Sequence, residues 1–318
     1  STGLAILGWI VAAGLIALAI RNTRDQLGER QVPLMGILAA AIFAGQMSNF
    51  TIPGGTSGHL IGGALAAILL GPWAGLLVMT AVIAVQALLF QDGGLLAMGL
   101  NIINMGVLTA FVGYFVYRPV RRVIPGRTGR LLGAAAGAWL SLVVTAAFAA
   151  VELALSGTSP LGFALPAMVG VHALIGVGEA LLTVFALGFI LAARPDLVTG
   201  EQAPGQRSAG WVAAGLVLAL AITLLAPLAS PYPDGLERVA EAFADPAAVE
   251  EEPVGFAVPG ERQFFGESRD APYEILPDYT IPLLGETGIS TIAAGMVGVA
   301  LVFGVTLGVA RLTTGRRA

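Results

Sequence analysis

Long apolar runs, separated by short polar or glycine- and proline-rich stretches, dominate the pattern of the chain. A helix that crosses a bilayer needs about 20 predominantly apolar residues, and most of the runs approach or exceed that length. The runs cover residues 3–20, 34–50, 59–71, 72–91, 95–117, 131–155, 164–193, 211–229 and 289–311. The pattern therefore predicts an all-α, polytopic membrane protein with about nine transmembrane helices.

The third run is shorter than the others. It holds only the 13 residues 59–71 and meets the fourth run at Gly71-Pro72. A segment of this length does not cross a bilayer unaided. We expect either a half-helix that enters the membrane and bends, or a span packed inside the protein, where irregular backbone is tolerated.

The arginines predict the direction of the spans. All 16 basic residues are arginines, and they follow mainly the odd-numbered runs. The exceptions, Arg238, Arg262 and Arg269, lie in the long loop after the eighth run. Because cytoplasmic loops are enriched in positive charge, nine crossings would place the N-terminus outside and the C-terminus in the cytoplasm.

Two polar stretches divide the chain. Residues 194–210 are expected to form a cytoplasmic linker between a seven-span domain (1–193) and a two-span domain (211–318). The acidic loop 230–288 contains Glu250-Glu251-Glu252 and is expected outside the membrane. It is either a solvated loop or a lid or cation-attracting vestibule over a site on that face.

Composition agrees with a membrane protein and excludes several functions. Only 11% of the residues are charged and 56% are hydrophobic, too few charges for a soluble surface and too many apolar residues for a disordered chain. Without cysteine there are no disulfides, iron–sulfur clusters or thiolate zinc sites. Without lysine there is no Walker-type phosphate loop, so any ATP hydrolysis belongs to a separate chain. Topology accounts for the arginines, and nothing supports binding to nucleic acid.

Two histidines are the leading candidates for chemistry. His59 follows the stretch Pro53-Gly54-Gly55-Thr56-Ser57-Gly58 and opens the third run. Glycines let the backbone come close to a ligand, and an imidazole at the end of a broken helix is well placed to coordinate a metal. An ordinary polar role is the alternative interpretation of this histidine.

The seventh run carries the second histidine, His172, with Glu179 two turns further along one helix face. Ionisable side chains within a span are costly and are functional candidates by default, although a structural link between helices also fits. Amides in or near the spans either bridge helices or surround a bound cation; they are Gln46, Asn49, Gln86, Asn101 and Asn104. No nucleophile and base are spaced as in an enzyme.

These motifs together resemble a known family. The stretch IPGGTSGHLIGGALAAILLGPWAGLL begins at Ile52, and QALLF, QDGG (91–94), NIINMG (101–106) and VHALIGVGEA (171–180) follow it. They resemble the CbiM/NikM family, the substrate-binding subunits of energy-coupling-factor transporters for cobalt or nickel. PDGLE at 233–237 is similar to the signature of the small companion subunit. The chain thus resembles a fusion of the two subunits.

The resemblance implies a metal site and a set of partners. In the family, the N-terminal amine, the amide nitrogen and imidazole of a histidine at position two, and a second histidine bind Ni²⁺ or Co²⁺ near the outer face. His59 matches the second histidine. A membrane coupling subunit and two ATPase subunits drive release inside a bacterial or archaeal cell, with no ATP bound to this chain. Expected supports of the site are Gln46, Asn49, Ser57, Asn101 and Asn104, with His172 and Glu179 as further candidates.

The start of the sequence departs from the family pattern. Family members begin with Met-His, whereas this sequence begins Ser1-Thr2-Gly3-Leu4, as if a short head belonged before Ser1. The sequence as printed is expected to bind the metal weakly, and a Met-His start is expected to restore tight binding. A membrane enzyme using His and Glu, a scaffold without a ligand site, and a subunit of the same class for another small substrate are the alternatives. The sequence leaves nickel and cobalt equally open.

Overall fold

The computed structural model describes residues 1–24, 27–28, 31–52, 56–199, 208–230, 232 and 275–313. Its elements are, in chain order, α1 (Thr2–Thr23), α2 (Gln31–Gln46), β1 (Phe50–Ile52), β2 (Thr56–Gly58), α3 (Gly63–Leu70), α4 (Pro72–Val85), η1 (Gln86–Phe90), α5 (Gly94–Asn101), η2 (Ile102–Leu108), α6 (Thr109–Val123), α7 (Gly126–Leu155), α8 (Leu161–Ala193), α9 (Asp196–Thr199), α10 (Ser208–Thr223), η3 (Ala226–Leu228), η5 (Pro277–Tyr279) and α12 (Gly288–Thr313). PDGLE (233–237), most of the acidic loop and the middle of the linker lie outside the described residues.

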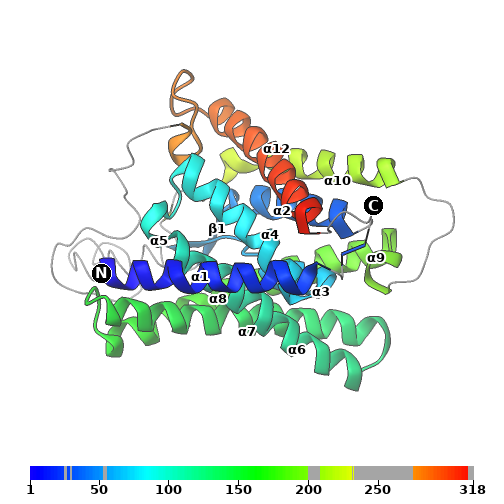
Figure 1. Ribbon diagram of the computed structural model, residues 1–318, viewed down its shortest axis with the longest axis horizontal. Helices are drawn as coiled ribbons and strands as arrows, with labels where there is room; N and C mark the ends of the chain where they lie inside the picture. The colour runs from blue at the N-terminus through cyan, green and yellow to red at the C-terminus, as the bar shows by residue number, and fades with distance from the viewer. Residues whose placement is uncertain are drawn as a thin grey trace.

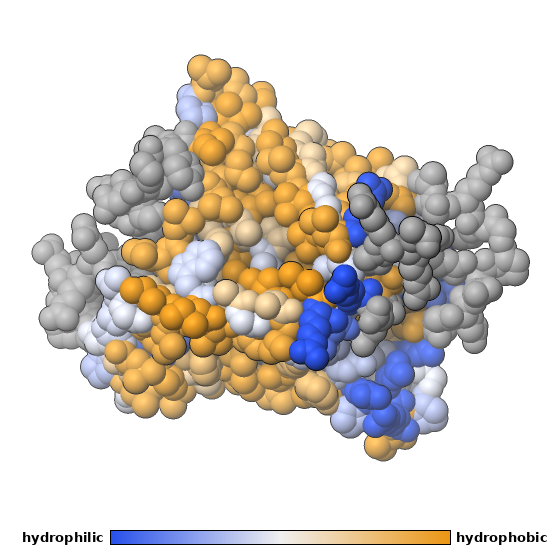
Figure 2. All heavy atoms as spheres, in the orientation of Figure 1, coloured by the Kyte–Doolittle hydropathy of each residue, from blue (hydrophilic) through white to orange (hydrophobic). Residues whose placement is uncertain are grey.

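Helices long and apolar enough to cross a membrane make up most of the fold. Seven occur in the described chain: Thr2–Thr23, Pro72–Phe90, Gly94–Val123, Gly126–Leu155, Leu161–Ala193, Gly210–Leu228 and Gly288–Thr313. Large apolar side chains cover their outward faces (Figure 2); Phe185 on α8, for example, is 75% exposed. Such a surface is stable against lipid and costly against water. The prediction of an all-α, multi-pass membrane protein is confirmed, while the count of nine crossings stays a prediction.

Helices α1, α7 and α10 run roughly along the long axis of the molecule, and α12 crosses it obliquely (Figure 1). The α6–α7 hairpin lies along one side, α10 and α12 lie on the other, and α4 lies between them. Leu76, Val78 and Met79 of α4 are fully buried, so this helix forms the centre of the core. Where α6 and α7 meet, a Cβ on Gly137 would lie 2.6 Å from the carbonyl oxygen of Gly113, so glycine permits this close crossing.

The two ends of the helical bundle differ in charge. α1 begins at one end of the molecule and α12 ends at the other (Figure 1), as an odd number of crossings requires. Basic side chains gather at the end where α12 finishes (Figure 2); the last turn of α1 carries Arg21, and that of α6 carries Arg121 and Arg122. This arrangement is the one that the predicted orientation requires, and the orientation itself stays a prediction.

A short β-hairpin interrupts the helices between α2 and α3. β1 and β2 pair antiparallel, with Phe50 opposite Gly58 and Thr51 opposite Ser57. Helix α3 then has only 8 residues before Gly71, at φ 87°, turns the chain into Pro72 at the start of α4. Positive φ costs little only at glycine. Helix α3 is short and ends at a sharp turn, as a half-helix would, and its residues 63–68 are buried, as in a segment packed inside the protein, so both interpretations of the third run stay predictions.

The C-terminal helices dock on the N-terminal ones through side chains of α2 and of η1. A Cβ on Gly215 of α10 would lie 2.6 Å from Ile37 of α2, so these helices are in close contact. In the segment before α12, the ring of Tyr279 stacks on Phe90, with 4.6 Å between centroids. The Tyr279 hydroxyl donates to Oδ2 of Asp92 at 2.5 Å and accepts from Nε2 of Gln86 at 3.2 Å.

Candidate metal-binding site

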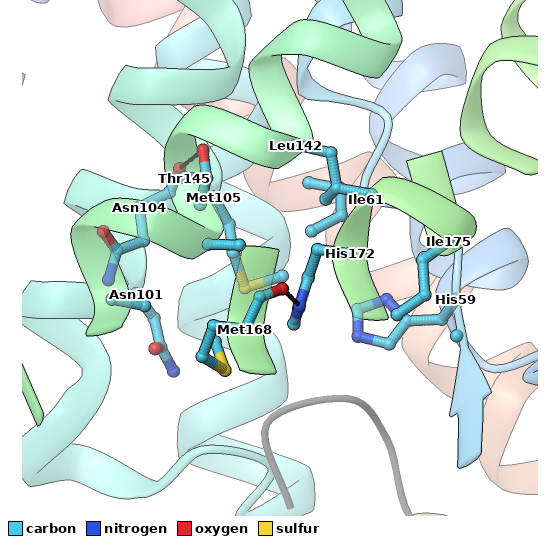
Figure 3. A pocket seen from close by; sticks show the side chains of 13 residues that line it. His59, Ile61, Asn101, Asn104, Met105, Leu142, Thr145, Met168, His172 and Ile175 are labelled. Carbon is cyan, nitrogen blue, oxygen red and sulfur yellow. Dashed lines mark hydrogen bonds between the residues drawn. The ribbon is translucent and has the colours of Figure 1, made fainter. Parts of the chain in front are cut away.

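A cavity of about 110 Å³ lies between the hairpin, η2, α7 and α8 (Figure 3). Four segments far apart in the sequence supply its wall: Gly58, His59, Ile61, Asn101, Asn104, Met105, Leu142, Thr145, Ala146, Ala149, Met168, His172 and Ile175. Both histidines of the chain therefore line one cavity.

His59 reaches this cavity because the backbone comes very close to α8 just before it. A Cβ on Gly58 would lie 2.7 Å from Cγ2 of Ile175, so only glycine fits there without movement of the Ile175 side chain. After Gly58 the chain is not helical until α3, and the His59 side chain is half-buried. Figure 3 shows its ring directed toward His172.

Hydrogen bonds select the tautomer of both rings. Nδ1 of His172 lies 2.8 Å from the carbonyl oxygen of Met168, and Nδ1 of His59 lies 3.2 Å from that of Leu60. A carbonyl oxygen can only accept, so each Nδ1 carries the proton when these bonds form. The lone pair of each neutral ring is then on Nε2, the form that binds a cation.

Glu179 lies outside the cavity wall and binds the chain next to it. Its side chain is only 2% exposed. Oε2 accepts the backbone N–H of Ile61 at 2.8 Å, and Oε1 accepts that of Gly62 at 2.9 Å. His172 and Glu179, which the sequence places on one helix face, thus do different things: one lines the cavity and the other holds its edge.

The five residues expected to support the site occupy different places. Asn101 and Asn104 line the cavity. Gln46 donates from Nε2 to the carbonyl oxygen of Ile61 at 2.9 Å, and Ser57 is buried and donates to the carbonyl oxygen of Tyr232 at 2.8 Å. Asn49 lies at the start of the hairpin, where its carbonyl oxygen accepts the N–H of Ser230 at 2.8 Å.

Three features of the site could not be predicted from the sequence, although Glu152, an ionisable side chain near the end of the sixth apolar run, is a candidate by itself. Met105 and Met168 line the cavity beside His172 (Figure 3), although methionine on an apolar helix is ordinarily a core residue. Thr145 also lines it, on α7. Glu152 accepts a hydrogen bond from Nδ2 of Asn104 at 2.7 Å, which leaves Oδ1 of Asn104 buried and without a partner in the described residues. Only the folded arrangement of η2, α7 and α8 brings these groups together.

The described donors fall short of a complete metal site. Within the described residues, no group of three or more His, Cys, Asp or Glu side chains is placed to hold a metal ion. Among the side chains that line the cavity, the two imidazoles offer nitrogen ligands for a metal. The amide nitrogens of Asn101 and Asn104 are poorly basic and do not. A cation bound here needs further ligands.

Comparison with known proteins identifies the family. The model of the cobalt uptake substrate-specific transmembrane region, CbiM, matches residues 1–197, which is more than half of the chain. The chain belongs to the CbiM family. A second model, the PDGLE domain, matches residues 209–315. Both parts of the predicted resemblance are confirmed.

Relatives of this CbiM family member are transport proteins. A putative fused nickel transport protein of Archaeoglobus fulgidus is 36% identical over 306 residues, covering 95% of this chain and 93% of that protein. A cobalt transport protein of Sorangium cellulosum is 36% identical over 60% of this chain and 88% of that one. The crystal structure of a truncated transition metal transporter is 32% identical, with a TM-score of 0.55 over 60% of this chain and 95% of that chain. These names agree with a transporter subunit and not with an enzyme.

Proposed function

We propose that this CbiM family member is the substrate-binding subunit of an importer for Ni²⁺ or Co²⁺. The cation binds at the outer face, in the cavity that His59 and His172 line, and leaves toward the cytoplasm. The observation that carries the proposal is the meeting of the chain's two histidines in that one cavity. Fused nickel transport relatives that cover nearly the whole chain support the choice of substrate.

Nitrogen donors agree with a transition metal ion as the substrate. Imidazole suits Zn²⁺, Cu²⁺, Fe²⁺ and Ni²⁺, and a planar set of nitrogens suits Ni²⁺ or Cu²⁺. When Nδ1 of each ring donates to its carbonyl oxygen, the lone pair of His59 and of His172 lies on Nε2, the atom proposed to bind the cation. Asn101 and Asn104 line the same cavity on the side away from His59 (Figure 3), where their amides could support the cation from outside its ligands.

The missing donors are proposed to come from a Met-His head before Ser1. Helix α1 packs on α5 at Trp9, whose Nε1 donates to the carbonyl oxygen of Leu95 at 2.9 Å. Helix α5 ends at Asn101, which lines the cavity. A terminal amine, an amide nitrogen and an imidazole would add three nitrogens to those of the cavity.

Energy for transport is proposed to come from other chains. A membrane coupling subunit and two ATPases would bind a membrane unit formed by residues 1–193, joined by the linker 194–210 to the companion-like unit 211–318. The lack of lysine, and hence of a Walker loop, in the whole sequence supports this division of work.

Nickel titration of three purified proteins tests the site. They are the chain as printed, the chain with Met-His before Ser1, and the latter with His59→Ala. The head is expected to raise nickel affinity strongly. His59→Ala is expected to lower it more than about 100-fold, because removing even an outer partner of a ligand costs about 10–100-fold. Mg²⁺, which prefers oxygen ligands, serves as the control ion and is expected to bind none of the three.

Two results would contradict the proposal. Equal nickel content with and without the head would exclude the head as a source of ligands. An unchanged affinity in His59→Ala, with an unchanged melting temperature, would exclude the cavity as the site. Uptake of labelled nickel by cells that also carry the coupling subunit and ATPases then tests transport itself.

A further inference from the structure

Glu179 is a carboxylate in a buried position, where an ionised group is energetically unfavourable. It lies within the membrane-spanning helix α8 and is almost completely buried. A buried ionisable group needs compensating partners. In the described part of the chain no arginine forms an ion pair with it, and the bonds that satisfy it come from the backbone of Ile61 and Gly62. The Glu179 carboxylate therefore binds the backbone of the Ile61–Gly62 segment.

The two bonds fix the segment more strictly than one bond would. Each carboxylate oxygen accepts a different N–H from consecutive residues, so both the position and the direction of the Ile61–Gly62 backbone are determined. Gly62 lies at φ 78° and precedes the first residue of α3. The first N–H groups of a helix have no partner within the helix, and negative charge is favourable at that end. Glu179 thus anchors the start of α3 to α8.

His59 lies between two contacts with the same helix. On one side, Gly58 packs directly on Ile175 of α8. On the other side, Glu179 holds Ile61 and Gly62. His172 is on the same helix, one turn before Ile175, so α8 carries one imidazole and also determines where the other one lies.

We infer that Glu179 is a positioning residue for the cation site: by binding the N–H groups of Ile61 and Gly62 it holds the His59 segment against α8, so that His59 faces His172. Glu179 does not touch the cation. The inference rests on the proposed function only for the identity of the cation. The placement of His59 by Glu179 can be tested in the metal-free protein.

Glu179→Gln is the discriminating substitution. The glutamine keeps the size of the side chain, but its NH₂ group cannot accept, so one of the two backbone N–H groups loses its partner. Thr183→Val is the matched control, since Thr183 is fully buried one turn further along α8 and outside the cavity wall. Both proteins are compared with the unsubstituted chain for melting temperature and for the measurements below.

A metal-free measurement reads the placement of His59 directly. The chain has no cysteine, so His59→Cys with His172→Cys supplies a unique pair for a short thiol-to-thiol cross-linker. The cross-linked yield, measured by peptide mass spectrometry, is expected to fall several-fold when Glu179→Gln is added and to stay unchanged with Thr183→Val. Hydrogen exchange of the 59–63 segment is expected to rise only with Glu179→Gln.

Metal binding completes the test in chains that keep both histidines and carry the Met-His head. Glu179→Gln is expected to lower nickel affinity about 10–100-fold, as loss of an outer partner of a ligand does, and to change the visible absorption of bound nickel. In a His59→Ala background it is expected to have no further effect, because the ligand that it positions is gone.

The outcomes separate the two claims. An unchanged cross-linked yield in Glu179→Gln would overturn the inference, as would an equal loss in Thr183→Val, which would indicate general loosening of α8. If the unsubstituted chain with the head bound neither nickel nor cobalt while the yield still fell only with Glu179→Gln, the proposed function would fail and the positioning role would stand.

Discussion

At the scale of single residues, glycines next to the cavity determine how close its parts can come. Gly58 and Gly178 both lie where a Cβ would collide with a neighbour, at 2.7 Å from Ile175 and from Phe50 respectively. Both contacts join the hairpin to α8. Glycines at these two positions therefore let the hairpin, and with it His59, lie close to α8.

We predict that Gly58→Ala lowers nickel affinity by moving His59 away from α8. Overpacking of a tight contact costs about 1–3 kcal/mol, and Ile175 is the residue that must move. Ile175→Ala, which removes the colliding atoms, is expected to restore much of the affinity when combined with Gly58→Ala. Gly170→Ala on the same helix, where a Cβ meets nothing within 4 Å, is the control and is expected to change little.

The sequence was informative about this site only in part. It singled out His59 and His172 because ionisable groups are rare in apolar runs. It could not show that Glu179 binds the backbone at Ile61 and Gly62, because a contact across more than 100 residues leaves no local pattern. For the same reason, Gln46 and Asn49 looked like Asn101 and Asn104 in the sequence, yet only the last two line the cavity.

At the scale of elements, α3, α6 and α7 meet at one point. A Cβ on Gly113 of α6 would lie 2.6 Å from Cβ of Ala64 of α3, and one on Gly137 of α7 would lie 2.6 Å from the carbonyl oxygen of Gly113. Helix α3 thus packs on α6 at Ala64, while Glu179 accepts the N–H of Gly62 just before it. The length of the apolar runs predicted the long helices. The hairpin could not be predicted because its glycine-rich sequence shows no strand alternation.

Gly137→Ala is predicted to destabilise the protein by about 1–3 kcal/mol, because the colliding atom belongs to the backbone and no side chain can rotate away. Thermal melting in detergent measures the effect. Gly188→Ala on α8 is the control, since a Cβ there comes no closer than 3.9 Å to Leu131. Equal melting temperatures for Gly137→Ala and the unsubstituted protein would show that α6 and α7 can separate without cost.

At the scale of the whole molecule, the C-terminal helices are bound to the N-terminal ones by more than the linker. Tyr279 stacks on Phe90 and bonds to Asp92, and the N–H of Leu276 donates to the carbonyl oxygen of Leu89 at 3.0 Å. Burial and the nearby Asp92 carboxylate raise the pKa of Tyr279 well above its ordinary value, because both disfavour the phenolate. The hydroxyl therefore remains a donor throughout the physiological range. Stacking partners so far apart in the chain could not be predicted from sequence.

We predict that Tyr279→Phe weakens the association of the two parts while leaving the fold intact, since stacking remains but the bond to Asp92 is lost. A protease site placed within 200–207 allows the chain to be cut after folding, and co-purification of the fragments is then measured. Tyr232→Phe, which keeps the carbonyl oxygen bound by Ser57, is the control.

Association of the unsubstituted halves is expected to persist from neutral to mildly alkaline pH. The association should weaken only above about pH 10, the ordinary pKa of tyrosine. A folded-state pKa raised above that ordinary value stabilises the fold fully below about pH 10, and this stabilisation is lost as the pH rises and the Tyr279 phenol ionises. Co-purification of Tyr279→Phe at the unsubstituted level would contradict this role.

The cavity wall also has a redox consequence. Met105 and Met168 carry the thioether sulfurs beside His172 (Figure 3), and the chain has no cysteine to react first. Oxidation would turn either sulfur into a sulfoxide, adding a polar oxygen to a wall that is otherwise suited to soft, apolar contact. Peroxide would then make the wall of this cavity more polar, and methionine sulfoxide reductases would reverse the change.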